Sequence, residues 1–187
     1  MFQPFHQSIR GRHLLPCLTT IASALVACEA YCASDGFDAV RCGADIPAAL
    51  VGKAMSNDKV RVLEHRHEDL GLRDLGGSEI SDQLFSASWQ ICGNEFMLLE
   101  DKRSVVRDVL RVPDHSKSSP AFVGTCAVNG KSVSGTIVAI LSNEEGSKTL
   151  SAKAAWRIDE RAVRFVTFPT AALRCPRDGV FTVDGGV

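Results

Sequence analysis

The sequence predicts an α+β domain: one short N-terminal helix packed on an antiparallel meander sheet of about six or seven strands. Three observations predict this class. One segment has helical spacing behind a capping residue, several segments alternate with period two, and an Asn-Gly pair joins two of them. We expect residues 34–187 to form this one domain, with a curled sheet as one form of the arrangement.

Residues 1–33 have the layout of a cleaved signal peptide. Arg10 and Arg12 give a positive start, residues 14–27 form an apolar run, and small residues follow. The run is too short to cross a bilayer. The alternative is a buried N-terminal helix, which Pro16 inside the run disfavours. We therefore expect export to the periplasm, the cell envelope or the medium.

The cleavage point has more than one candidate. Residues 25–28 read Leu-Val-Ala-Cys, and this segment resembles a bacterial lipobox. The resemblance implies that the thiol of Cys28 is acylated and becomes the mature N-terminus, which would be the protein's only attachment to a membrane. The alternatives are ordinary cuts after Ala30 or after Ala33.

Four cysteines remain in the fold once those in or beside the signal are set aside: Cys42, Cys92, Cys126 and Cys175. An even number with spacings of 50, 34 and 49 residues, and no Cys-x-x-Cys pair, predicts two structural disulfides. The alternative is four buried free thiols. Of the three connectivities, we favour Cys92 with Cys126 and Cys42 with Cys175.

The predicted helix covers residues 46–55, after a short strand over residues 37–42. Asp45 has the chemistry of an N-cap, and Pro47 falls in the first turn, where its missing N–H costs nothing. Gly52 and the Asn-Asp pair that follows are stop signals.

The remaining elements are predicted as strands. Residues 60–67, 87–92 and 105–112 show alternation or β-branched content, the last being compatible with a helix as well. Two hairpins follow. Residues 122–128 and 132–141 flank Asn129-Gly130, which suits a type I′ turn, and residues 153–158 pair with 163–168. The polar segments 69–81 and 113–120 are either mobile rims of a site or plain connections.

The sharpest chemical candidate is a histidine pair. On a strand, His65 and His67 point the same way, about 7 Å apart, so both imidazoles can reach one zinc ion. His115 is the remaining histidine of the mature chain and completes a three-histidine set. The competing interpretation is a solvated strand, because Arg66 and several carboxylates surround the pair.

The segment His65-x-His67-x-Asp69 resembles the metal motif of the metallo-β-lactamase family, and the turn around His115 resembles that family's later histidine turn. The resemblance implies a zinc-dependent hydrolase. It covers about six residues and then departs from the family, because Leu70 stands where a further histidine is expected.

The function that the sequence favours is a small exported binding or interaction module without a convincing catalytic set or cofactor. Its partner would be a protein, an envelope component or a small ligand held on the concave face of the sheet. With 21 basic and 22 acidic residues, the net charge of −1 gives no basic face for nucleic acid. The alternative function is the zinc-dependent hydrolase.

Overall fold

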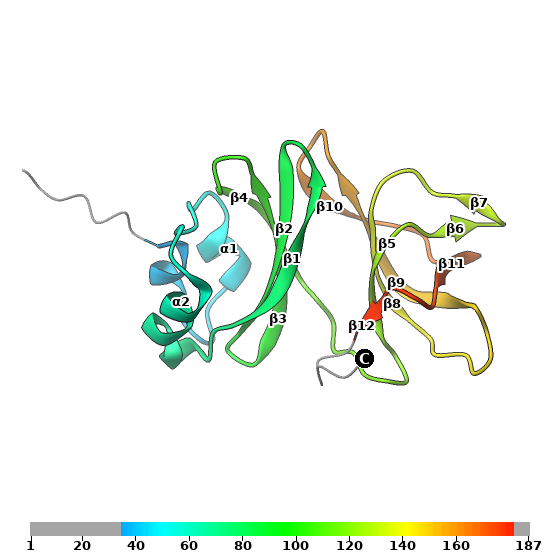
Figure 1. Ribbon diagram of the computed structural model, residues 1–187, viewed down its shortest axis with the longest axis horizontal. Coiled ribbons are helices and arrows are strands. Elements are labelled where there is room, and N and C mark those ends of the chain that lie inside the picture. The colour runs from blue at the N-terminus through cyan, green and yellow to red at the C-terminus, as the bar shows by residue number, and fades with distance from the viewer. Residues whose placement is uncertain (1–34, 182–187) are drawn as a thin grey trace, which may run out of the picture. The chain divides into compact units, whose positions relative to one another are not determined.

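The computed structural model describes residues 35–181, which contain short helices and many antiparallel strands (Figure 1). The helical elements are η1 (Gly36–Ala39), α1 (Ile46–Leu50), α2 (Val60–Arg66) and η2 (Glu68–Leu70). The strands are β1 (Arg73–Ser81), β2 (Leu84–Ile91), β3 (Asn94–Asp101), β4 (Val106–Arg111), β5 (Ala121–Gly124), β6 (Ala127–Val128), β7 (Lys131–Ser132), β8 (Ile137–Leu141), β9 (Thr149–Asp159), β10 (Arg164–Thr167), β11 (Leu173–Pro176) and β12 (Val180–Phe181).

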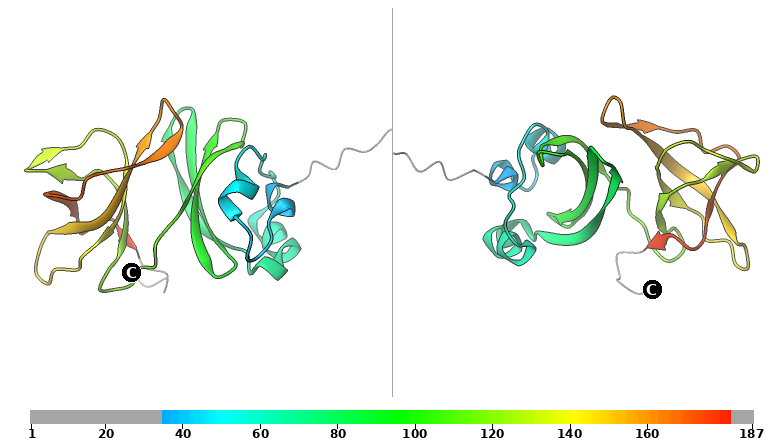
Figure 2. Two further views of the ribbon diagram at one scale, coloured as in Figure 1. Left: turned by 180° about the vertical axis from the view of Figure 1, so that it is seen from behind. Right: turned by 45° about the horizontal axis from the view of Figure 1, so that its top comes forward.

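The strands form two sheets where the sequence predicted one. The first sheet has the order β1-β2-β3-β4, and the second has the order β12-β5-β8-β9-β11-β6-β7, with β10 paired to β9. All strand pairs are antiparallel, as predicted, and both sheets curl (Figure 2). The single-sheet prediction is therefore wrong, whereas the antiparallel β-rich character is confirmed.

Helix α1 begins where predicted and ends earlier. The Asp45 side chain accepts a hydrogen bond from the backbone N–H of Ala48 at 3.1 Å, which makes it the N-cap. The helix stops at Leu50 because the chain then pairs with the edge of β4. Gly52 N donates to Val106 O at 2.8 Å, and Val106 N donates to Lys53 O at 2.9 Å. These bonds cover that edge of the first sheet.

Two predicted strands are helical. Residues 37–42 were expected to be extended, but η1 forms there, with the Asp35 side chain capping the N–H of Phe37. Residues 60–66 form α2, with His67 as its C-cap, and Leu63, His67 and, in η2, Leu70 recur at helical spacing and are buried. The β-branched Val60 and Val62, which suggested a strand, are exposed.

One predicted loop is a strand. Residues 73–81 of the glycine-rich polar segment form β1, which pairs with β2. A Cβ on Gly77 would lie 2.4 Å from the carbonyl oxygen of Ser86, so glycine is required where the two backbones approach. Residues 113–120 remain a connection between the sheets.

Strand β3 is buried on both faces. Phe96 and Leu98 face a core shared with the helices, whereas Met97 and Leu99 belong to a second core that includes residues of β8 such as Val138. This two-sided burial accounts for the continuous apolar run in β3, because neither face meets water.

The second sheet contains both predicted turns. Asn129 and Gly130 have φ of +52° and +78°, as a type I′ turn requires, but they join only the short strands β6 and β7. The two predicted arms do pair, since β5 pairs with β8 and β6 with β7, but the chain leaves the strand at Gly124 and each arm is divided in two. The hairpin of β9 and β10 is confirmed. In residues 35–181, no helix is long and apolar enough to span a membrane.

Candidate functional site

The three candidate zinc ligands lie in separate environments. Since residues 60–66 are helical, His65 and His67 are turned about 200° apart and do not share a face. The His65 side chain is 87% exposed and lies 3.8 Å from Glu68. The His67 imidazole is buried, and its Nε2 lies 3.2 Å from Oδ2 of Asp35. The strand geometry that was expected to place both imidazoles on one face is therefore wrong.

The third histidine has a different partner. His115 is buried beside Glu95, with Nε2 3.5 Å from the nearer carboxylate oxygen. Burial raises the pKa of Glu95, and the nearby His115 opposes this shift. Within residues 35–181, no group of three His, Cys, Asp or Glu side chains is placed to hold a metal ion. The structure thus does not bring His65, His67 and His115 together.

The four cysteines of the fold form two disulfides, as predicted. Their pairing differs from the favoured one: Cys42 bonds to Cys92, and Cys126 bonds to Cys175. The first bridge joins the η1–α1 connection to the turn between β2 and β3. The second joins the segment between β5 and β6 to β11, which pairs with β6. The expected Cys92–Cys126 bridge does not form, because Cys92 lies in the β2–β3 turn of the first sheet and Cys126 packs in a separate core with the second sheet. Two disulfides favour an oxidising compartment.

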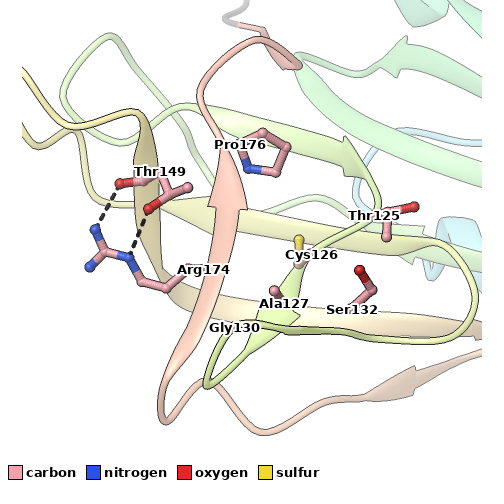
Figure 3. Close-up of a pocket in the computed structure, with 8 residues that line it drawn as sticks. All are labelled: Thr125, Cys126, Ala127, Gly130, Ser132, Thr149, Arg174 and Pro176. Carbon is pink, nitrogen blue, oxygen red and sulfur yellow. Dashed lines mark hydrogen bonds between the residues drawn. The ribbon is translucent and has the colours of Figure 1, made fainter.

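A pocket of about 270 Å³ lies on the second sheet beside Cys126 (Figure 3), which is bonded to Cys175. Its lining comes from the β5–β6 connection, the β6–β7 hairpin, the start of β9, and β11. The lining residues are Thr125, Cys126, Ala127, Gly130, Ser132, Thr149, Arg174 and Pro176. Three stretches far apart in sequence, residues 125–132, Thr149 and residues 174–176, therefore meet at one hollow.

The positive charge at the rim of the pocket is neutralised. Arg174 Nη2 donates to Oε2 of Glu144 at 2.8 Å and to the backbone oxygen of Thr149 at 2.7 Å. Its Nη1 donates to Ser151 Oγ at 2.7 Å, and Figure 3 shows its two contacts with Thr149. Hydrogen bonds to Ser151 and Arg174 hold the pKa of Glu144 below its usual range. The guanidinium is thus used to fix the β8–β9 loop.

The groups left to a ligand are mostly uncharged. Ala127, Pro176, Cys126 and the carbon stem of Arg174 supply apolar surface, and Thr125 and Ser132 supply exposed hydroxyls. Hydroxyl groups both donate and accept hydrogen bonds. The pocket can therefore take a small neutral molecule that combines an apolar part with a hydrogen-bonding group.

Sequence reasoning missed this pocket, although it found parts of its frame. The Asn-Gly turn and the cysteines were recognised as structural features, but nothing in the sequence places Arg174 beside Thr149. That contact results from the pairing of β11 with β9, a long-range register that local patterns do not encode. The residues of the expected lipidation site and of the signal peptide lie outside the described residues.

No protein-family model, curated protein or solved structure matches this chain.

Proposed function

We propose that the protein is a small exported binding module whose pocket on the second sheet binds a small neutral ligand. The observation that carries this proposal is the convergence of three distant stretches of the chain on one hollow that offers hydroxyl groups and apolar surface. Its volume of about 270 Å³ lies just below the roughly 300–1,000 Å³ typical of ligand pockets, which favours a small ligand.

The frame of the pocket supports a binding role because it is pre-organised. Cys126 is bonded to Cys175, the Asn129-Gly130 turn fixes the β6–β7 hairpin, and Arg174 ties β11 to the β8–β9 loop through Glu144. A site that is held in shape before binding loses less conformational entropy on binding. Affinity then depends on the fit of the ligand and not on ordering the protein.

The charge state of the lining defines the class of ligand. Arg174 is the one charged residue among those that line the pocket, and because it pairs with Glu144 the lining offers no unpaired cation to a carboxylate or a phosphate. An anion would have to displace Glu144 from its hydrogen bonds, whereas a neutral amide or alcohol would not. We therefore assign the pocket to uncharged ligands.

A matched set of probes tests this assignment. Benzamide, benzyl alcohol, benzoate and benzylammonium have similar size and differ in charge. Titrated into the ¹⁵N-labelled protein, the two neutral probes should shift amide signals of residues 125–132 and of Arg174 in a saturable way. Preferential binding of benzoate at these residues would show that Arg174 is available to anions and would overturn the assignment. If neither neutral probe gives saturable shifts, the proposal that the pocket is a ligand site is wrong.

Export is the second part of the proposal. The arrangement of Arg10, Arg12 and the apolar residues 14–27 supports it, as do the two disulfides. Intact mass spectrometry of the protein recovered from the cell envelope tests it. We expect loss of 27 to 33 N-terminal residues, and a diacylglyceryl group with an acyl chain on Cys28 would select the lipid-anchored form. Retention of Met1 in a cytoplasmic fraction would contradict export.

A further inference from the structure

The two disulfides differ in their access to solvent. Cys126 and Cys175 are 2% and 0% exposed and belong to the core of the second sheet. Cys42 is exposed in the turn between η1 and α1, and Cys92 is half-buried against the core shared by the helices and the first sheet. Solvent therefore reaches the Cys42–Cys92 bridge from the Cys42 side.

The backbone at Cys92 adopts an unfavourable conformation. Cys92 and Gly93 have φ of +52° and +77° and form the two-residue turn between the paired residues Ile91 and Asn94. Glycine, asparagine and aspartate suit the first position of such a turn, and cysteine does not. A left-handed non-glycine residue is held there at a cost in free energy.

We propose that Cys42–Cys92 is a thiol-exchange site, at which an external thiol attacks the sulfur of Cys42. Exchange needs an attacking thiolate to reach a sulfur along the S–S axis, which burial prevents at the other bridge. The exposed side of the bridge presents Cys42 to the incoming thiol and places Cys92 in the leaving position. The proposal does not depend on the pocket of the second sheet.

The exchange transfers two electrons from an external dithiol to the Cys42–Cys92 bridge. A thiolate of a dithiol forms a bond to Cys42 Sγ while the Cys42–Cys92 bond breaks, and the electron pair leaves on Cys92, which takes a proton from water. The second thiol of the donor then loses its proton and attacks the mixed disulfide, releasing Cys42 as a thiolate that is protonated in turn. The dithiol is oxidised to a disulfide, and the bridge is reduced by two electrons and two protons.

We expect reduction of the Cys42–Cys92 bridge to leave the rest of the fold in place. The bridge ties the η1–α1 connection to the β2–β3 turn, but Phe37, Val40, Ile46 and Leu50 remain buried between these helices and the first sheet. Their apolar burial retains the helices after the bridge opens. The Cys126–Cys175 bridge, in a separate core, stays closed.

Graded reduction under native conditions tests the proposal. The protein is incubated with reduced glutathione at increasing concentration, quenched with N-ethylmaleimide and mapped by peptide mass spectrometry. We expect Cys42 and Cys92 to be modified at least tenfold faster than Cys126 and Cys175, with glutathione attached to Cys42. Equal rates, faster opening of Cys126–Cys175, or glutathione attached mainly to Cys92 would overturn the proposal.

Two controls separate access from intrinsic reactivity. The C126S/C175S double variant should retain glutathione attachment at Cys42, whereas the C42S/C92S double variant should be modified at least tenfold more slowly under the same native conditions. In urea, wild-type protein should react at similar rates at both bridges, because unfolding exposes all four sulfurs. A rate difference that persists in urea would show that burial is not its cause, and this test does not require either variant to fold.

Discussion

The imidazole Nε2 of His67 lies 3.2 Å from Oδ2 of Asp35, and both side chains are buried. Asp35 also accepts a hydrogen bond from the N–H of Phe37, and the Phe37 ring packs edge-on against His67. The pair thus joins the start of η1 to the end of α2. His67 is therefore part of the core contact between two helical elements, in contrast to the exposed His65.

Because of this difference, we expect two neighbouring histidine substitutions to affect stability to different extents. His67→Ala should lower the free energy of unfolding by about 2 to 3 kcal/mol, because Asp35 would keep its burial and lose a partner. His65→Ala is the matched control and should change it by no more than about 0.5 kcal/mol. Urea unfolding of both variants measures these effects. If His67→Ala lowers the free energy of unfolding by no more than His65→Ala does, the structural role of the His67–Asp35 pair is contradicted.

A second prediction concerns pH. Glu100 pairs across the sheet with Phe85 and Val106, and burial, together with the adjacent Asp101, raises its pKa to about 7. Since its pKa is higher in the folded state than the usual 4.5, the folded state binds more protons. The resulting stabilisation is present below about pH 4.5 and is lost as pH rises toward about 7.

Glu100→Gln should therefore raise the free energy of unfolding at pH 8 by about 1 to 2 kcal/mol, after allowance for partial exposure, and change it little at pH 4. Glu68→Gln, on an exposed side chain, is the control. Chemical unfolding at the two pH values measures the difference. An equal effect of Glu100→Gln at both values would show that its ionisation is not linked to folding.

The disulfides allow a third comparison, because they close loops of almost equal length. The bridges span sequence separations of 50 and 49 residues, so loss of either should cost about 4 kcal/mol from chain entropy. Removal of the buried Cys126–Cys175 pair by alanine should cost about 1 to 2 kcal/mol more, because it also leaves a cavity. Removal of Cys42–Cys92 leaves a smaller cavity, because Cys42 is already exposed to water. Equal or reversed costs in urea unfolding would contradict the difference in burial.

The sequence predicted those elements whose signals are local. Asp45 caps α1, Asn129-Gly130 forms a tight turn, and β9 and β10 form a hairpin, since each depends on a few neighbouring residues. The prediction failed at α2, where Val60 and Val62 suggested a strand although they face solvent. Packing of Leu63 against the core, rather than β-propensity, decides this segment.

The division into two sheets and the disulfide pairing were not predictable in this way. Both depend on which distant strands pair, and Cys126 meets Cys175 because β6 lies beside β11. The same pairing gathers Thr125, Ser132 and Arg174 around the pocket. The candidate site therefore results from topology, whereas the strand expected around His65 and His67 is a helix, on which the two side chains do not share a face.

We propose the pocket on the second sheet as a ligand site, and a benzamide titration of three proteins tests this proposal most directly. Ala127→Leu should fill the pocket, and Ala162→Leu, in the exposed β9–β10 turn, is the control of equal added volume. We expect saturable amide shifts around residues 125–132 in the wild type and in Ala162→Leu, with at least tenfold weaker binding in Ala127→Leu. Unchanged binding in Ala127→Leu, or shifts confined to other parts of the protein, would contradict the account.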